Sequence, residues 1–337
     1  MAKAIFDKSN VLVIGGAGFI GSHLCEELLR SSKVICVDNF ISSSQMNINH
    51  LLKNQNFIFI KHNIIEPLDL EKSPELERFN LKLQGIQEIY NLAIPMHPKD
   101  FEKVEMETLL TNSQGTKNAL DLAVKYNARF LHTSSAVIYG SPIDEDMMYE
   151  ESYVGALDPL TPRANYDLGK KFSETMVYFY GRVNKIDCRI VRLFRTYGPR
   201  ISVDKGHMVP DFVISALKNE DLKIYGDANF STSLTYVTDI VDGIVKMMQL
   251  PENIGPVNLG SDYRIKLVDV CKMIIEKTKS SSGIKFEPPL LFMSKLGLPD
   301  ISKAKKMLGW IPIVTLDKGL DRTIEYAMAA RYQLGIK

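Results

Sequence analysis

Short apolar runs alternate with amphipathic stretches through the first half of the chain. The pattern predicts strands at Val11–Ile14, Val34–Val37, Phe57–Ile60, Glu88–Leu92, Ala128–His132 and Cys188–Leu193. Between the first two strands, Ser22–Arg30 has the periodicity of an amphipathic helix. Short strands that are apolar on both faces and alternate with helices indicate a parallel sheet covered on both sides. We therefore expect a doubly wound α/β fold.

The second half of the chain differs from about Thr196 onwards. Turn-forming residues crowd together in YGPR, GHMVPDF, KIYGDANFSTS and LPENIGP, and the helical patterns become shorter. Because 337 residues exceed what one core usually organises, we expect two domains. We place the sheet domain at residues 1–194 with 233–260. A smaller α/β substrate-binding domain is expected at 195–232 with 261–337.

Composition changes this picture little but excludes several classes of function. Hydrophobic residues make up 45% of the chain, and 41 Lys and Arg against 40 Asp and Glu give a charge of +1. This balance provides no broad basic surface for nucleic acid or an anionic membrane. The four cysteines are far apart and lack metal-ligand spacing, so we expect no metal site. Without a signal-peptide core or a membrane-spanning apolar run, a cytoplasmic protein is expected.

A glycine-rich run, GGAGFIG, follows the first predicted strand and opens the first predicted helix. Gly15 permits a tight turn, Gly18 lets a pyrophosphate approach the backbone, and Gly21 lets the helix pack closely on the strand. The helix N-terminus offers unpaired N–H groups and a positive dipole to the phosphates. We therefore expect Gly15, Gly18, Phe19, Ile20 and Gly21 to hold a dinucleotide in a Rossmann-type fold.

The second predicted strand ends in an acidic residue, Asp38, 17 residues after Gly21. A carboxylate at this place accepts hydrogen bonds from both hydroxyls of a ribose, and its charge repels the 2′-phosphate of NADP. The predicted cofactor is therefore NAD, with Asp38 and the adjacent Asn39 among the residues that bind it.

The GxxGxxG spacing resembles the extended, sugar-nucleotide branch of the short-chain dehydrogenase/reductase superfamily. The resemblance runs almost from end to end, and it implies a nucleoside-diphosphate sugar as the substrate. It also implies that Leu92 and Ala93, at a strand end, line the cofactor and that Asn63 and Ile64 lie beside its adenine. The family usually has Asp-Val at the latter pair, so Asn63 keeps a hydrogen-bond acceptor but removes a charge.

Tyr166 and Lys170 are four residues apart in a helical stretch and therefore share one helix face. A lysine cation and the positive nicotinamide ring favour the phenolate, so we expect a lowered pKa for Tyr166. Tyr166 then takes a proton from a sugar hydroxyl while hydride leaves for NAD⁺, and Lys170 also holds the nicotinamide ribose. The resemblance assigns Ser135, at the end of the fifth strand, to a hydrogen bond with the reacting sugar oxygen.

The chain is overall most similar to UDP-glucuronate decarboxylases, but it departs from them where the chemistry lies. Val137 stands where those enzymes and the related 4,6-dehydratases have an acid, and Thr232 stands where the decarboxylases have an arginine. Valine cannot assist the proton transfers of decarboxylation or dehydration, whereas a 4-epimerase only oxidises C4, rotates the keto-sugar and returns the hydride.

We therefore predict a 4-epimerase of a sugar nucleotide, within polysaccharide biosynthesis. UDP-glucuronate decarboxylase and 4,6-dehydratase are the alternatives. A non-catalytic nucleotide-binding regulator is a further alternative, which the presence of Tyr166, Lys170 and Ser135 disfavours.

Several further residues are expected at the substrate. Arg195 stands where the family has asparagine, and we expect it to replace the charge lost at Thr232 and neutralise the substrate diphosphate. A solvated turn arginine is the alternative. His97 follows a cofactor-lining strand end, so we expect it in the sugar pocket, with a surface histidine as the alternative. Arg200 and Tyr225 are expected to contact the substrate as well.

The sequence leaves three features open. Glu145 or Glu150 could replace the missing acid from elsewhere in the fold. The charged segment Pro67–Gln87 is either a helix or a surface insertion. Family members commonly pair through two helices, here around Glu102–Tyr126 and Ala164–Val183, so the resemblance implies a homodimer.

Overall fold

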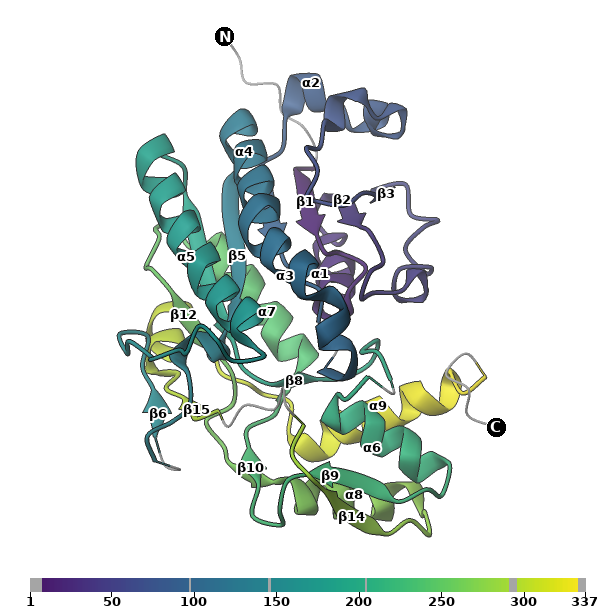
Figure 1. Ribbon diagram of the computed structural model, residues 1–337. Helices are drawn as coiled ribbons and strands as arrows, with labels where there is room; N and C mark the ends of the chain where they lie inside the picture. Colours follow the sequence, from purple (N-terminus) through teal and green to yellow (C-terminus); the bar gives the residue numbers. More distant parts are fainter. Residues whose placement is uncertain (1–7, 97, 145–146, 204, 291–295, 333–337) are drawn as a thin grey trace.

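A parallel sheet of seven strands forms the centre of the computed structural model, which describes residues 8–96, 98–144, 147–203, 205–290 and 296–332 (Figure 1). In spatial order the strands are β12 (Val257–Leu259), β7 (Cys188–Leu193), β5 (Arg129–Ser135), β4 (Glu88–Asn91), β1 (Asn10–Ile14), β2 (Lys33–Asp38) and β3 (Phe57–Lys61). The order reverses between β1 and β4, because the chain runs out to β3 and then crosses back. The predicted doubly wound α/β fold is confirmed, and all six predicted strands lie in this sheet.

Helices cover both faces of the sheet. One face holds α1 (Phe19–Leu28) and α7 (Val237–Gln249); the other holds α3 (Glu105–Leu110), the π-helical turn η5 (Thr111–Gly115), α4 (Thr116–Tyr126) and α5 (Ala164–Asn184). Successive side chains of β1 point to opposite faces of the sheet. Val11 and Val13 pack with α1 on one face. Leu12 and Ile14 pack with α4 on the other face. Within the described ranges no helix is both long and apolar enough to cross a bilayer.

The C-terminus of α7 is fixed to the sheet by arginines. The buried guanidinium of Arg189 on β7 donates to the carbonyl oxygens of Met247, Met248 and Leu250. Arg129 on β5 donates to the Met248 oxygen as well, at 2.6 Å. The last carbonyls of a helix lack intrahelical donors and carry the negative end of its dipole, so cations stabilise this end.

A smaller group of elements lies beside the carboxyl ends of the central strands (Figure 1). It consists of α6 (Met208–Leu217), β9 (Leu222–Tyr225), α8 (Leu267–Thr278), β14 (Ile284–Glu287) and α9 (Leu316–Ala329). Strands β9 and β14 pair in parallel, and the three helices pack on one another. Helix α7 and strand β12 lie with the sheet. The division of the chain into two domains stays a prediction.

Short two-stranded ladders connect the irregular segments near the sheet ends. They pair β8 (Thr196–Tyr197) with β11 (Thr235–Tyr236), β6 (Met148–Tyr149) with β15 (Leu298–Pro299), and β10 (Ser231–Thr232) with β13 (Ile265–Lys266). Single helical turns complete the connections at η1 (Gln45–Asn47), η4 (Pro98–Val104), η6 (Ala136–Tyr139) and η7 (Ala304–Leu308). The substrate side of the molecule therefore depends on many short elements that are distant in sequence.

The charged segment around Pro67–Gln87 forms three short helices rather than one long helix or a loose insertion. They are η2 (Leu70–Lys72), η3 (Pro74–Phe79) and α2 (Leu81–Gln84). Leu70, Leu76, Phe79 and Leu81 are buried in the core shared with α4, whereas Leu83 is exposed. The side chain of Asn10 on β1 donates to the Phe79 and Gly85 carbonyl oxygens at 2.9 Å, which fixes the segment to the amino end of this interior strand.

Candidate functional site

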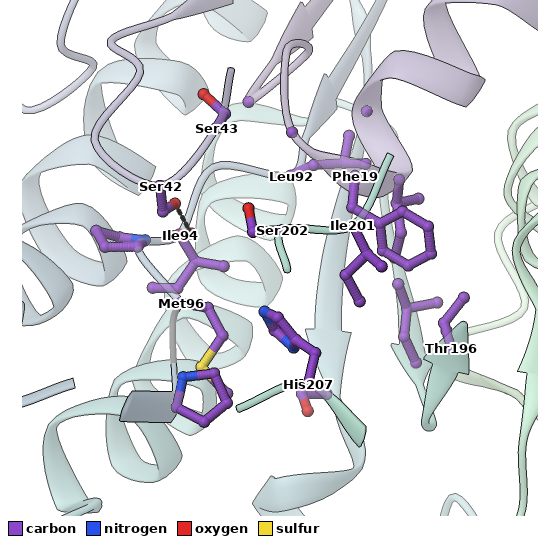
Figure 2. Close-up of a pocket in the computed structure, with 18 of the residues that line it drawn as sticks. Phe19, Ser42, Ser43, Leu92, Ile94, Met96, Thr196, Ile201, Ser202 and His207 are labelled. Carbon is purple, nitrogen blue, oxygen red and sulfur yellow. Dashed lines mark hydrogen bonds between the residues drawn. The ribbon is translucent and has the colours of Figure 1, made fainter. Parts of the chain in front are cut away.

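A cavity of about 410 Å³ opens at the carboxyl ends of the central strands, between the sheet and the smaller group. The ends of β1, β2, β4, β5 and β7 form one side, and residues of α6 and β9 form the other. In sheets of this kind, ligands bind where the strand order reverses, which here is between β1 and β4. Figure 2 shows the part of the cavity between Phe19, Ile94 and His207.

The glycine-rich run makes a tight turn from β1 into α1. Gly15 has a φ of +80°, and a Cβ atom on Gly21 would lie 2.1 Å from the Gly15 carbonyl oxygen. Gly18 is the N-cap of α1 and provides no side-chain hydrogen bond, so the N–H groups of the first turn remain available to an anion. The helix begins at Phe19, three residues before the predicted start, because the Gly18 backbone already leads into it. This cradle fits the pyrophosphate of a dinucleotide.

The Asp38 carboxylate lies at the end of β2 beside the glycine-rich turn. Its Oδ2 accepts the Ala17 N–H at 3.0 Å, and its Oδ1 accepts the Phe40 N–H at 2.9 Å and the Ser43 hydroxyl at 2.6 Å. These bonds hold the carboxylate at the cavity wall, next to Asn39, which also lines the cavity. The arrangement fits a ribose and agrees with the predicted preference for NAD.

The other predicted cofactor residues also reach the cavity. Leu92 and Ala93 line it after β4, and Asn63 and Ile64 line it after β3. The Asn63 Oδ1, however, accepts the backbone N–H of Ile65 at 3.2 Å. A hydrogen bond from adenine to this oxygen would have to coexist with the bond from Ile65 or replace it. Adenine recognition by Asn63 therefore stays a prediction.

Three predicted catalytic residues line the cavity together. Tyr166 and Lys170 lie in the first two turns of α5, and Ser135 ends β5. Ser135 hydrogen-bonds Tyr166, and its Oγ also accepts the Val137 N–H at 3.4 Å. The Lys170 ammonium donates to the Thr133 carbonyl oxygen at 2.8 Å. The structure therefore brings the predicted base, cation and hydroxyl donor to one place.

Burial determines how the two titratable groups behave in the protein alone. It raises the pKa of Tyr166, and the hydrogen bond from Ser135 and the charge of Arg163 lower that pKa by less. The expected lowering of the Tyr166 pKa by Lys170 is thus not found, because Tyr166 is deeply buried and the acting cation is Arg163. Burial also lowers the pKa of Lys170 to about 8, with Glu174 opposing the shift.

The position where related enzymes have an acid is apolar here. Val137 is 6% exposed and packs in one cluster with Phe101 and Tyr166. Ile94, Met96 and Leu296 pack against the same cluster and also line the cavity. The wall next to Tyr166 therefore offers no proton donor or acceptor at this point.

Two arginines lie on the substrate side of the cavity. Arg163 forms an ion pair with Asp167 at 2.9 Å, and its guanidinium carbon lies 6.0 Å from the centre of the Tyr166 ring. The guanidinium carbon of Arg195 lies 5.8 Å from the centre of the Phe230 ring, and Phe230 is the residue immediately before β10. Burial and the charge of Arg163 lower the pKa of Arg195 to about 10, so it is a cation at neutral pH. The predicted solvated turn arginine is not what the structure shows.

Arg200 does not line this cavity, contrary to its predicted substrate contact. Its backbone is left-handed, with a φ of +69°, and its guanidinium donates to the Glu26 carboxylate of α1 at 2.5 Å. The neighbouring Pro199 carbonyl oxygen contacts the His23 Nε2 of α1 at 3.1 Å. The turn directs the Arg200 side chain towards α1 and away from the substrate side.

The remaining predicted residues divide between the cavity, the surface and the undescribed part of the chain. Tyr225 on β9 lines the cavity. Glu150 is exposed and is not among the lining residues, so it does not replace the missing acid. His97 and Glu145 lie outside the described residues.

Among the lining residues that reasoning from the sequence missed, Arg163 and His207 carry side chains suited to binding. Arg163 stands three residues before Tyr166, where the i, i+3 spacing on one helix face was a usable signal. His207, at the N-cap of α6, projects its imidazole into the cavity (Figure 2). Nothing in its local sequence distinguishes it from a surface histidine, because the segment from Gly198 to His207 is irregular.

Known proteins are similar to this chain over most of its length. The family model described as "NAD dependent epimerase/dehydratase family" matches residues 11–260. A UDP-glucuronic acid decarboxylase of Arabidopsis thaliana is 38% identical over 316 residues, which are 94% of this chain and 67% of that protein.

Solved structures are similar in fold over the whole molecule. An epimerase from Methanothermobacter thermautotrophicus has a TM-score of 0.85 at 26% identity, covering 98% of this chain and 95% of that one. The UDP-glucuronic acid 4-epimerase of Bacillus cereus, solved with UDP-glucuronic acid and NAD, has a TM-score of 0.81 at 27% identity, covering 95% and 99%. The likeness therefore extends over both the sheet and the smaller group.

Proposed function

Because the chain belongs to the NAD-dependent epimerase/dehydratase family, we propose that it is a 4-epimerase of a nucleoside-diphosphate sugar. The family and the cofactor NAD, both predicted from the motifs, are confirmed. The choice of reaction within the family is our proposal, and it depends on the composition of the cavity wall.

The main observation is that no carboxylate lies on the described cavity wall around Tyr166. Among the described residues that line the cavity, the only acids are Asp38 and Asp211. Asp38 lies at the cofactor end, and Asp211 accepts the Gly206 N–H at 2.9 Å and faces the Lys99 ammonium at 3.7 Å. The wall around Val137 is apolar. Dehydration and decarboxylation need polar assistance at C5 and beyond, whereas epimerisation needs only a base at the C4 hydroxyl.

The residues of the chain are sufficient for that simpler chemistry. Bound NAD⁺ supplies the hydride acceptor at C4 and later the hydride donor. Tyr166 accepts the proton of the C4 hydroxyl as the carbonyl forms, and returns it when the hydroxyl is restored. Ser135, which already hydrogen-bonds Tyr166, steadies the same sugar oxygen. Lys170 holds the nicotinamide ribose from the buried side of α5.

Arg195 provides the anion-binding part of the proposed substrate site. Its guanidinium lies beside the ring of Phe230. Phe230 is two residues before Thr232, the position at which the resemblance gives the decarboxylases an arginine. The cation is thus supplied to the same neighbourhood from the end of β7 instead of from β10. Together with Tyr225 on β9, this placement supports a diphosphate at Arg195 and a nucleoside beyond it.

Decarboxylation of UDP-glucuronate is the second candidate. It is favoured by the 38% identity to a UDP-glucuronic acid decarboxylase over 94% of this chain. Both candidates share oxidation at C4 and differ only in the fate of the keto-sugar. The product therefore decides between them.

Incubation of the purified protein with UDP-, dTDP-, CDP- and GDP-sugars, UDP-glucuronate included, tests the proposal. We expect a product of unchanged mass whose NMR spectrum shows inversion at C4. Release of CO₂ from UDP-glucuronate, or loss of water, would replace the epimerase by a decarboxylase or a dehydratase. The Tyr166→Phe protein is the matched control, because it should yield neither product.

We also propose a homodimer formed through the helices opposite α1 and α7. Exposed apolar side chains gather on α3, α4 and α5, namely Met106, Leu109, Leu110, Val124, Phe172, Tyr178, Phe179 and Val183. Exposed apolar clusters of this kind mark interaction surfaces. Sedimentation analysis should give a dimer for the native chain and a monomer for Phe179→Glu. A native monomer would remove the proposal.

A further inference from the structure

His132 on β5 is a buried titratable residue that the proposed reaction does not use. Its side chain is almost completely buried and lies between β4 and α5. The imidazole Nδ1 is 3.3 Å from the Asn91 Nδ2, and the Nε2 is 3.0 Å from the Ser173 hydroxyl oxygen. Ser173 follows the catalytic Lys170 by three residues, so His132 lies directly behind the catalytic helix turn.

The partners of His132 determine its tautomer. The Asn91 Nδ2 is an amide nitrogen and only donates, so the His132 Nδ1 must accept. The Ser173 hydroxyl donates to the Lys170 carbonyl oxygen at 2.9 Å, which leaves its oxygen to accept from the His132 Nε2–H. The imidazole is therefore neutral and carries its proton on Nε2.

Two further hydrogen bonds close this chain into a circuit. The Lys170 ammonium donates to the Thr133 carbonyl oxygen at 2.8 Å, and the Thr133 hydroxyl donates to the Asn91 carbonyl oxygen at 3.2 Å. The circuit of Asn91, His132, Thr133, Lys170 and Ser173 thus joins the ends of β4 and β5 to α5. It holds Lys170 twice, by its backbone carbonyl and by its ammonium.

The charges around His132 keep it neutral. The Lys170 ammonium and burial place the pKa of His132 well below its ordinary value. Asn91, Thr133 and Ser173 are uncharged, and the nearest acid on α5, Glu174, is paired with Arg192 at 2.8 Å. A second cation beside Lys170 would repel it, so only the neutral form fits the circuit.

We propose that His132 is a positioning residue for oxidation at C4, because its neutral imidazole fixes the first turns of α5 against the strand ends that line the NAD site. Through α5 it sets the places of both Lys170 and Tyr166. An apolar side chain of similar size would fill the space but would hold neither Asn91 nor Ser173. The inference rests on the proposed function only for the oxidation at C4, which an epimerase and a decarboxylase both carry out.

The kinetic test compares three variants in the NAD-bound enzyme. His132→Leu should lower kcat about tenfold, the effect of losing about one hydrogen bond's free energy in the reacting state, with the KM of the sugar nucleotide changed less than about twofold. It should also move the acid limb of the pH–rate profile upward, because a displaced α5 weakens the hydrogen bond from Ser135 that lowers the pKa of Tyr166. His132→Gln should restore most of the rate, since its side chain can accept from Asn91 and donate to Ser173.

Leu131→Ala is the matched control for a purely structural effect. Leu131 is adjacent on β5 and equally buried, but it belongs to the core on the opposite face of the sheet. This variant should lower the unfolding temperature and leave the acid limb in place. Equal shifts of the acid limb in Leu131→Ala and His132→Leu, or no shift in His132→Leu, would overturn the proposal.

A spectroscopic test separates this inference from the reaction catalysed. In ¹⁵N-histidine-labelled protein with NAD, the His132 resonances are assigned as those that are missing from the spectrum of His132→Leu. In the native protein they should have the chemical shifts of a neutral Nε2–H imidazole from about pH 8 down to about pH 5. An imidazole that becomes protonated near pH 6.5, or that shows the Nδ1–H tautomer, would contradict the circuit. This result is independent of which sugar nucleotide is turned over.

Discussion

The two ends of the cavity are built in different ways. The cofactor end is built around one turn in which Gly15, Gly21 and Asp38 are close in sequence, and this turn packs on the backbone of Leu92 and Ala93. The substrate end combines residues from β5, α5, β7, α6 and β9, which span residues 129 to 225. The first end therefore has a local turn at its centre, and the second depends on tertiary packing throughout.

This difference separates the parts of the site that can change from those that cannot. A Cβ atom on Gly15 or Gly21 would lie less than 3 Å from neighbouring backbone atoms, so few substitutions fit at the glycine turn. At the substrate end, Arg195 follows β7 and Val137 lies on an apolar wall, and neither position has a backbone constraint of this kind. We therefore expect substitutions to be tolerated more readily there than at the glycine turn.

The largest effect is expected where the two ends meet, at Tyr166. Tyr166→Phe should lower kcat by about 10²- to 10⁴-fold, because the proton transfer loses its base. The affinity for NAD should stay within about threefold, since the glycine turn and Asp38 are unchanged. Steady-state turnover and NAD titration check both values. A Phe variant with more than about a tenth of the native kcat would remove Tyr166 from the reaction.

Gly21→Ala tests how strictly the cofactor end is built. The new Cβ would lie 2.1 Å from the Gly15 carbonyl oxygen, so α1 must move away from β1. We expect NAD affinity to fall about 100-fold, equivalent to about 3 kcal/mol of overpacking. Gly309→Ala is the control, because no atom lies within 4 Å of its Cβ and only the positive φ of 59° opposes it. Unchanged NAD binding in Gly21→Ala would show the turn to be adaptable.

Moving the arginine tests the substrate end. Arg195→Asn should weaken UDP binding about 10- to 100-fold, the range for a hydrogen bond to a charged group, and should leave uridine binding unchanged. Adding Thr232→Arg to this variant should restore UDP binding only if the new side chain reaches the cavity, because Thr232 is 4% exposed and lies two residues after Phe230, which Arg195 contacts. Calorimetric titration with UDP and uridine measures both. If only UDP-glucuronate binding falls, Arg195 recognises a sugar carboxylate instead of the diphosphate.

The smallest expected effect is a change in unfolding temperature that results from burial of the Lys170 charge. Burial lowers its pKa from 10.5 to about 8, so below pH 8 the folded state holds a charge that is more stable in the unfolded chain. Stability from this group therefore rises as pH increases from about 8 to about 10.5. Lys170→Met should raise the unfolding temperature at pH 7 by about 2–4 °C while abolishing turnover, and the gain should shrink at about pH 9.5.

Lys171→Met is the control for this comparison. Lys171 donates to the Gly155 carbonyl oxygen at 2.7 Å, so its loss should lower the unfolding temperature at both pH values. A Lys170→Met protein that is less stable than the native chain at pH 7 would show that the hydrogen bond to Thr133 outweighs the burial of charge.

The sequence was sufficient for six of the seven strands of the sheet and for the glycine turn, because these depend on local patterns, whereas the short strand β12 was not predicted. Strand alternation, the spacing of three glycines and an acid at a strand end each have one structural solution. The predicted start of α1 was three residues later than the observed start at Phe19, because Gly18 was not recognised as the N-cap.

The substrate end was harder to predict because residue identity does not give side-chain direction in irregular backbone. Arg195 and Arg200 are five residues apart, yet one lines the cavity and the other contacts α1, since φ is positive at Arg200. His207 has no periodic neighbours to indicate its direction. The pKa of Tyr166 was misjudged for a related reason: the spacing to Lys170 is visible in the sequence, but the depth of burial is not.

The pairing of β12 with β7 has a consequence for how the chain acquires its structure during synthesis. The sheet is complete only when residues 257–259 have left the ribosome, long after β7 at residues 188–193. Until then β7 is an open edge strand, and the Arg189 guanidinium, which is paired with Asp187, lacks the α7 carbonyl oxygens that accept its other hydrogen bonds. A nascent chain that stops near residue 200 would therefore hold a nearly whole dinucleotide site on an aggregation-prone edge.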